Sequence, residues 1–117
     1  MKHFHRASSH LFILDRGEPL IATLTPELKR LEIPGGTISG LGALSDVQLG
    51  YYELAHKEYI RKTFTDEDEL ISLAGNVAIK DGAPFIHVHA ALGDRDFAVF
   101  GGHLFEATVA VTTEISV

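Results

Sequence analysis

Residues 85–107, FIHVHAALGDRDFAVFGGHLFEA, contain three of the seven histidines and have the pattern of a β-hairpin. Apolar residues alternate with His87 and His89 in the period of two that is typical of a strand. Both imidazoles should therefore share one face, about 6–7 Å apart along the strand. The sequence GDRD at residues 93–96 indicates a turn, and the apolar run after it predicts the returning strand.

The returning strand can bring a third histidine to the same place. If residues 94–96 form the loop, His103 lies directly opposite His87, with Cβ atoms about 5 Å apart on one face. This register is an assumption, because the Gly101–Gly102 pair allows a bulge and a one-residue shift would turn His103 over. Three converging imidazoles suit a tetrahedral metal ion with one open position, so we predict a metal site at His87, His89 and His103.

The composition is that of one globular domain. The 117 residues are 45% hydrophobic and 22% charged, and no apolar run approaches the length of a membrane span. The N-terminal sequence MKHFHRASSH lacks the apolar centre of a signal peptide, so we expect a cytoplasmic protein without membrane association. Because there is no cysteine, imidazole or carboxylate groups would have to bind any transition metal.

The net charge disfavours direct binding to nucleic acid. Ten basic and sixteen acidic side chains give a formal charge of −6, which repels phosphate backbones at long range. We therefore do not expect the isolated chain to bind DNA directly.

The remaining patterns predict an α+β fold with one helical segment and about seven strands in a large, mostly antiparallel sheet. Residues 18–31 have apolar positions at helical spacing, with an acidic residue first and basic residues last. Pro26 interrupts this pattern, so either the helix begins near Thr25 or two short helices abut. One short helix cannot cover such a sheet, so we expect a homo-oligomer. Besides the two strands of the hairpin, we expect strands at 10–15, on both sides of a turn at 45–46 within 37–54, at 57–64, at 70–79 and, as a long last strand, at 104–117.

Other candidate binding residues have simpler structural explanations. Residues 1–9 read as a loosely held N-terminal tail, although His3 and His5 in it have the spacing of possible ligands. The GLG sequence at residues 40–42 could cradle a phosphate, but a bulge or a close backbone approach also explains it. The acidic run at residues 66–69 lacks the spacing of a calcium loop and is best explained as a solvated turn.

Four motifs in this order resemble one known family. They are SGLGALSDV at residues 39–47, ELISLAGN at 69–76, HVH at 87–89 and GGHL at 101–104. From His10 to Val117 the chain resembles the plants and prokaryotes conserved (PPC) domain, which accompanies AT-hook motifs in plant nuclear proteins and stands alone in bacteria and archaea. The combination is far more specific than any one of the motifs.

The resemblance implies a tail at residues 1–9 and a PPC-like domain at residues 10–117, with a strongly curved antiparallel sheet. For the prokaryotic members it implies a homotrimer and a metal site at the HxH and GGH histidines, which are His87, His89 and His103 in this sequence. The plant proteins contact DNA through a basic hook that this sequence lacks, while their PPC domain mediates self-association and partner binding.

The first functional hypothesis is a metal-binding homotrimer with a regulatory, DNA-associated or scaffold role. Zinc suits three neutral imidazoles best, although nickel, copper or iron is tolerable. In this hypothesis the metal is structural or senses a ligand, and the partner is a protein or a nucleic acid. A purely structural variant holds that the three histidines only line a polar cleft between subunits.

The alternative is a small metal-dependent hydrolase or lyase. A three-histidine zinc site lowers the pKa of its bound water to about 7, which would supply the nucleophile. Such an enzyme also needs a general base. Glu106 points away from His103 on simple alternation, and Asp94 and Asp96 are better explained as turn residues. The sequence therefore favours a binding protein over an enzyme.

Overall fold

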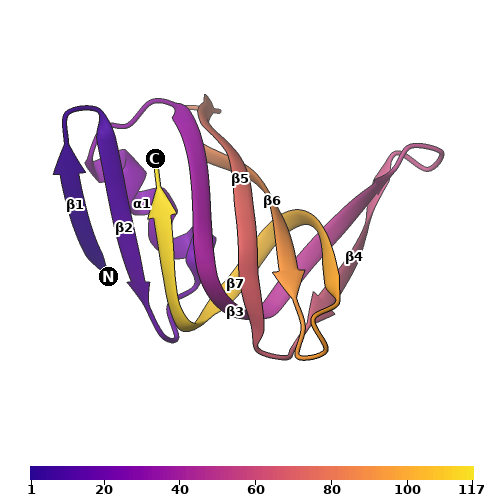
Figure 1. Ribbon diagram of the computed structural model, residues 1–117. Helices are drawn as coiled ribbons and strands as arrows, with labels where there is room; N and C mark the ends of the chain where they lie inside the picture. The colour runs from indigo at the N-terminus through magenta and orange to yellow at the C-terminus, as the bar shows by residue number, and fades with distance from the viewer.

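Two strands of 18 residues each, β3 (Gly36–Glu53) and β7 (Val99–Ser116), organise the sheet in the computed structural model, which describes residues 1–117 (Figure 1). The other elements are β1 (Lys2–Arg6), β2 (Ser9–Asp15), α1 (Leu20–Arg30), β4 (Glu58–Phe64), β5 (Asp68–Lys80) and β6 (Ala83–Gly93). The strand order is β1-β2-β7-β6-β5-β3-β4, all pairs are antiparallel, and β3 also pairs with β7. The predicted α+β fold with about seven strands and one helical segment is confirmed.

The sheet curves until part of it closes on itself. Strand β7 pairs with β6 at residues 99–103, with β2 at residues 112–116, and with β3 along most of its length. Strand β3 in turn pairs first with β5 and then with β4. The pairings β3–β5–β6–β7–β3 therefore form a closed ring, in agreement with the strong curvature that the family resemblance implied (Figure 1).

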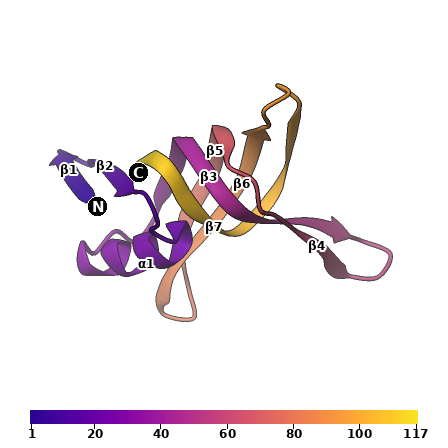
Figure 2. The same ribbon diagram turned by 90° about the horizontal axis from the view of Figure 1, so that it is seen from below.

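Helix α1 packs against β6 and β7 and covers one side of the core (Figure 2). Its apolar face consists of Leu20, Leu24 and Leu28, which recur every four residues and are at most 1% exposed. These leucines belong to a cluster of 21 buried apolar residues that forms the core between the helix and the curved sheet. The single helix has 11 residues and is too short to cross a membrane.

Helix α1 runs through Pro26 without interruption, so both alternatives that the sequence offered for Pro26 are wrong. Proline has no N–H group, and the carbonyl of Ala22, four residues earlier, therefore lacks its helical donor. Ala22 and Pro26 are both exposed, so water can satisfy that carbonyl. The proline is tolerated because it lies on the solvent side of the helix.

A carboxylate from β7 caps the N-terminus of α1. Glu106 accepts hydrogen bonds from the backbone N–H groups of Ile21 and Ala22, at 2.8 and 3.0 Å. The helix itself has no acidic residue in its first turn. Glu18, which we expected to favour the helix start, precedes the helix and accepts a hydrogen bond from the Asp15 N–H at 2.8 Å. Glu106 therefore satisfies two N–H groups that the helix leaves unpaired and faces the positive end of its dipole.

We expected residues 1–9 to form a loosely held tail, whereas Lys2–Arg6 form strand β1. It pairs with β2 over its whole length, and the N-terminal ammonium group lies 2.7 Å from the carboxylate of Asp15. We did not predict this strand, because the sequence is mostly polar and the strand is ordered by backbone pairing with β2. The rings of His3 and His5 also stack on His10 of β2, at centroid distances of 5.2 and 4.5 Å.

Strand β3 is one strand where we expected two. The turn predicted at residues 45–46 is wrong: the positive φ of Asp46, 49°, marks an irregularity in the pairing with β7, and the strand continues beyond it. Gly40 and Gly42 lie in the same strand, and a Cβ atom on Gly42 would lie 2.2 Å from the Thr112 carbonyl oxygen. These glycines allow a close backbone approach, so the phosphate-loop alternative is also wrong.

The end of β3 and all of β4 form a hairpin, residues 47–64, that projects from the body and that we call the arm (Figures 1 and 2). Every residue of β4 except Phe64 is exposed. The arm also presents large apolar side chains to solvent, among them Tyr51 at 71% and Ile60 at 55% exposure. The rest of the chain therefore leaves most of the arm uncovered.

We predict that Glu106→Ala lowers the free energy of unfolding by about 1–2 kcal/mol, because two backbone N–H groups at the helix start lose their charged acceptor. Glu106→Gln keeps an acceptor of the same size without the charge and should lose less. Urea denaturation of the three proteins measures the difference. A loss for Glu106→Ala within about 0.5 kcal/mol, as for an ordinary surface substitution, would contradict the capping role.

Candidate metal centre

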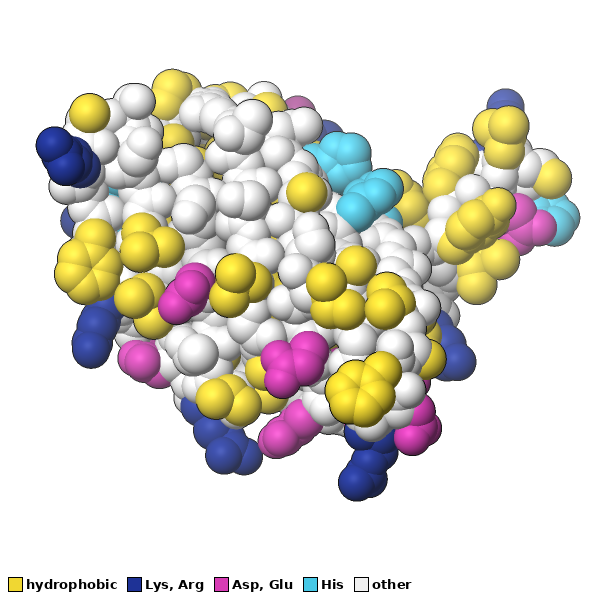
Figure 3. Space-filling view, in the orientation of Figure 1, with side chains coloured by type: hydrophobic (Ala, Val, Ile, Leu, Met, Phe, Trp, Pro, Cys, Tyr) yellow, Lys and Arg dark blue, Asp and Glu magenta, His cyan; other side chains and the backbone are white.

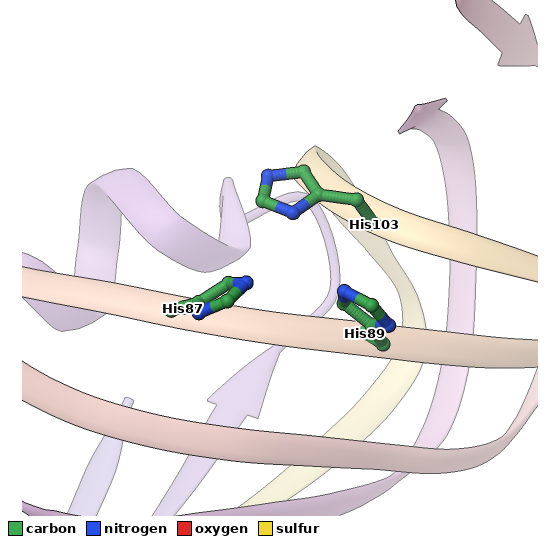
Figure 4. A group of neighbouring side chains, drawn as sticks. All are labelled: His87, His89 and His103. Atoms are coloured by element: carbon green, nitrogen blue, oxygen red, sulfur yellow. The ribbon is translucent and has the colours of Figure 1, made fainter. Parts of the chain in front are cut away.

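Three histidine side chains come together on the outer face of β6 and β7 (Figure 4). His87, His89 and His103 each offer a ring nitrogen, and the three nitrogens lie within 4.8 Å of one another. The ring centroids form a nearly regular triangle with sides of 5.4, 5.6 and 5.7 Å. Histidine side chains are visible on the surface of the body next to the arm (Figure 3). The structure thus brings together the three residues that the sequence pattern predicted to converge.

The alternation in β6 positions two of these side chains. Ile86, Val88 and Ala90 face the core and are 8%, 1% and 4% exposed. His87 and His89 lie between them and are exposed on the opposite face. Burial of the apolar residues therefore fixes the direction of both imidazoles.

The third histidine joins them through a register that differs from the expected one. We expected His103 opposite His87 across a three-residue loop, whereas the structure pairs His103 with His89 across the five residues 94–98. Residues 99–103 pair with β6 without the bulge that the glycines allowed. The error amounts to two residues, and because side chains alternate with a period of two, His103 still lies on the expected face.

The longer loop is stabilised by its first residue. The Asp94 carboxylate accepts hydrogen bonds from the backbone N–H groups of Asp96 and Ala98, at 2.9 and 3.0 Å. Such side-chain bonds to the following backbone are characteristic of aspartate in turns. Asp94 is thus a turn residue, as the sequence indicated, and it explains why the loop extends to Ala98.

His103 is the least exposed of the three histidines, and its Nδ1 atom is buried without a hydrogen-bond partner. In Figure 4 this nitrogen faces the space between the rings of His87 and His89. The pKa of His103 is lowered below its usual value, mainly by burial of the ring. The nearby His87 and His89 and the charge of Arg61 lower it further. Its ring is therefore neutral at neutral pH, which is the form that binds metal ions.

Aromatic side chains enclose one side of His103. The ring centroid of Tyr59 lies 5.0 Å and that of Phe105 4.5 Å from its own. Arg61 places its guanidinium carbon 3.7 Å from the centroid of the Phe105 ring. The alternation in residues 57–64, KEYIRKTF, puts Tyr59 and Arg61 on one face of a strand. Only the pairing of β4 with β3 and of β3 with β7 brings that face to His103. Sequence reasoning therefore missed these neighbours.

The carboxylates considered as a general base face other parts of the molecule. Glu106 is engaged at the N-terminus of α1, and Asp94 stabilises the loop between β6 and β7. The grouping that can hold a metal consists of the three imidazoles alone. Three ligands on an open face leave a fourth coordination position for water or for a ligand from solution.

The other four histidines lie away from this group. His3 and His10 are hydrogen-bonded between Nε2 and Nδ1 at 3.0 Å, and His5 stacks beside them on the β1–β2 hairpin. His56 lies 3.0 Å from the Glu53 carboxylate at the tip of the arm. These contacts account for all four side chains without a bound ligand.

Comparison with known proteins places the chain in a family. The model of the Plants and Prokaryotes Conserved (PCC) domain matches residues 1–117. The plant- and prokaryote-conserved (PPC) protein of Pyrococcus horikoshii is 36% identical, with a TM-score of 0.88 over 98% of this chain and 78% of that one. A metal-containing protein from Archaeoglobus fulgidus is 37% identical, with a TM-score of 0.87 over 97% and 80%. A protein from Ralstonia eutropha, whose name proposes DNA binding, is 28% identical, with a TM-score of 0.90 over 99% and 80%.

No match was found among the curated proteins. The family model nevertheless covers the whole chain, including β1, and two archaeal structures share more than a third of their aligned residues with it. The resemblance that the four sequence motifs indicated is therefore confirmed, and this chain belongs to the Plants and Prokaryotes Conserved domain family.

Proposed function

We propose that this chain is a metal-binding protein in which His87, His89 and His103 hold one divalent transition-metal ion, zinc being the best suited. The observation that carries the proposal is the buried Nδ1 atom of His103, which has no hydrogen-bond partner and faces the other two imidazoles. A buried polar atom without a partner costs about 1–3 kcal/mol, and a metal–nitrogen bond would remove that cost. The similarity to a metal-containing archaeal protein supports the same assignment.

The donor set fits such an ion. Nitrogens bound to tetrahedral zinc at about 2.0–2.1 Å are about 3.3 Å apart, so nitrogens that lie within 4.8 Å can reach one ion through small ring rotations. A zinc ion held in this way retains one position for an exchangeable ligand and acidifies a water molecule bound there. Neutral imidazoles without thiolates also accept nickel, copper or iron.

We predict that the purified chain without a histidine tag binds one zinc ion, and that His89→Ala weakens zinc binding by more than about 100-fold, because loss of a direct ligand exceeds the cost of losing a supporting residue. Metal analysis after incubation with zinc and removal of the excess measures the stoichiometry. Competition with a chelator measures the affinity.

His3→Ala is the matched control, since it removes one imidazole from the β1–β2 hairpin and leaves the three proposed ligands in place. It should bind zinc like the unaltered protein. If the unaltered chain holds no zinc after incubation, or if His3→Ala loses the metal while His89→Ala keeps it, the proposed function is wrong.

We further propose that the chain assembles into a homotrimer with a regulatory or scaffold role. The number of three subunits is the one that the family resemblance implies. The support for an interface is the arm, whose exposed apolar residues include Tyr51 and Ile60, paired side by side across β3 and β4. Apolar side chains grouped on a projecting hairpin are typical of an interface. The formal charge of −6 disfavours direct contact of this chain with DNA, so a DNA association like the one that the name of a relative proposes would here require a protein partner.

We predict a mass of three times 12.8 kDa, about 38 kDa, by light scattering coupled to size-exclusion chromatography. Ile60→Lys should shift the protein toward the monomer, because it places a charge in the apolar face of the arm. Thr63→Lys adds the same charge at an exposed position on the other face of β4 and should leave the mass unchanged. A monomeric unaltered chain, or equal effects of both substitutions, would contradict this assembly through the arm.

A further inference from the structure

Arg61 lies in the same cross-strand row as two of the histidines. His89 of β6 is directly opposite His103 of β7, His103 is opposite Gly50 of β3, and Gly50 is opposite Arg61 of β4. Directly paired residues share one face of a sheet. The Cα atoms of Arg61 and His103 are therefore about 10 Å apart, two strand spacings, with no side chain at Gly50 between them.

Gly50 leaves the space in which the aromatic neighbours of His103 pack. A Cβ atom at Gly50 would lie 2.4 Å from the Phe105 ring and 3.0 Å from the Tyr59 ring. Phe105 in turn carries the guanidinium of Arg61 on its face, at 3.7 Å, and lies 4.5 Å from the ring of His103. The aromatic rings thus form a surface that connects the metal centre with the guanidinium and holds that group in place.

Arg61 has no acidic partner within the chain. Its side chain takes part in none of the ion pairs, and the arginines that donate side-chain hydrogen bonds are Arg16 and Arg30. Arg61 is also exposed, so its N–H donors are available to a ligand from solution. A divalent ion and a guanidinium on one surface repel each other, and an anion that contacts both removes this repulsion.

We propose that the metal centre and Arg61 together bind a small dicarboxylate. One carboxylate takes the open coordination position of the metal, and the other pairs with Arg61 through two parallel N–H···O bonds above Phe105. This inference rests on the metal site proposed above. The ring of Phe105 lies between His103 and the guanidinium, at 4.5 and 3.7 Å from them, so the ligand needs two carboxylates joined by a short aliphatic linker, as in succinate and glutarate.

Cobalt(II), which binds imidazole sites and absorbs visible light according to its coordination, provides the readout. The cobalt-loaded chain is titrated with acetate, malonate, succinate and glutarate at constant ionic strength. Succinate or glutarate should bind more tightly than acetate. Arg61→Gln should weaken the binding of the preferred dicarboxylate about tenfold while changing the affinities for acetate and for cobalt by less than about twofold.

Lys62→Gln is the matched control, because it removes the same charge from the next residue, which lies on the opposite face of β4 over the ring of Phe64. It should change none of the affinities. Equal effects of the two substitutions, or an equal loss of acetate and succinate binding in Arg61→Gln, would overturn the dicarboxylate proposal while the metal site stands. A chain that takes up no cobalt, zinc or other divalent metal would overturn both.

Discussion

The register between β6 and β7 is the constraint on which the rest of the site depends. It places His89 directly opposite His103, and the alternation in β6 then adds His87 on the same face. Two features fix this register: the loop that Asp94 stabilises, and the apolar side chains that must face the core. A shift by one residue would turn His103 inward and leave two histidines without a third.

Much of this arrangement was predictable because it depends on period-two patterns within short segments. The sequence HVH between apolar residues predicted the shared face of His87 and His89. The register was wrong by two residues, because the number of loop residues depends on the side-chain bonds of Asp94. The three histidines nevertheless converge, since a displacement by an even number of residues keeps each side chain on the same face of the sheet.

What the sequence did not reveal depends on contacts between distant segments. Glu106 meets the helix start 84 residues earlier in the chain, and Arg61 reaches the surroundings of His103 only through two further strand pairings. Strand β3 continues through the irregularity at Asp46 because β7 pairs with it on both sides of this residue. Backbone pairing also orders β1, whose polar side chains carry no such signal. None of these pairings has a local sequence pattern that would predict it.

We propose that three imidazoles from one hairpin share a metal ion. Anomalous scattering from crystals grown with zinc, measured on both sides of the zinc absorption edge, tests it most directly. We expect one strong peak per chain, about 2.0–2.1 Å from a ring nitrogen of each of His87, His89 and His103. The absence of a peak there, or a peak bound only by the histidines of the β1–β2 hairpin, would contradict it.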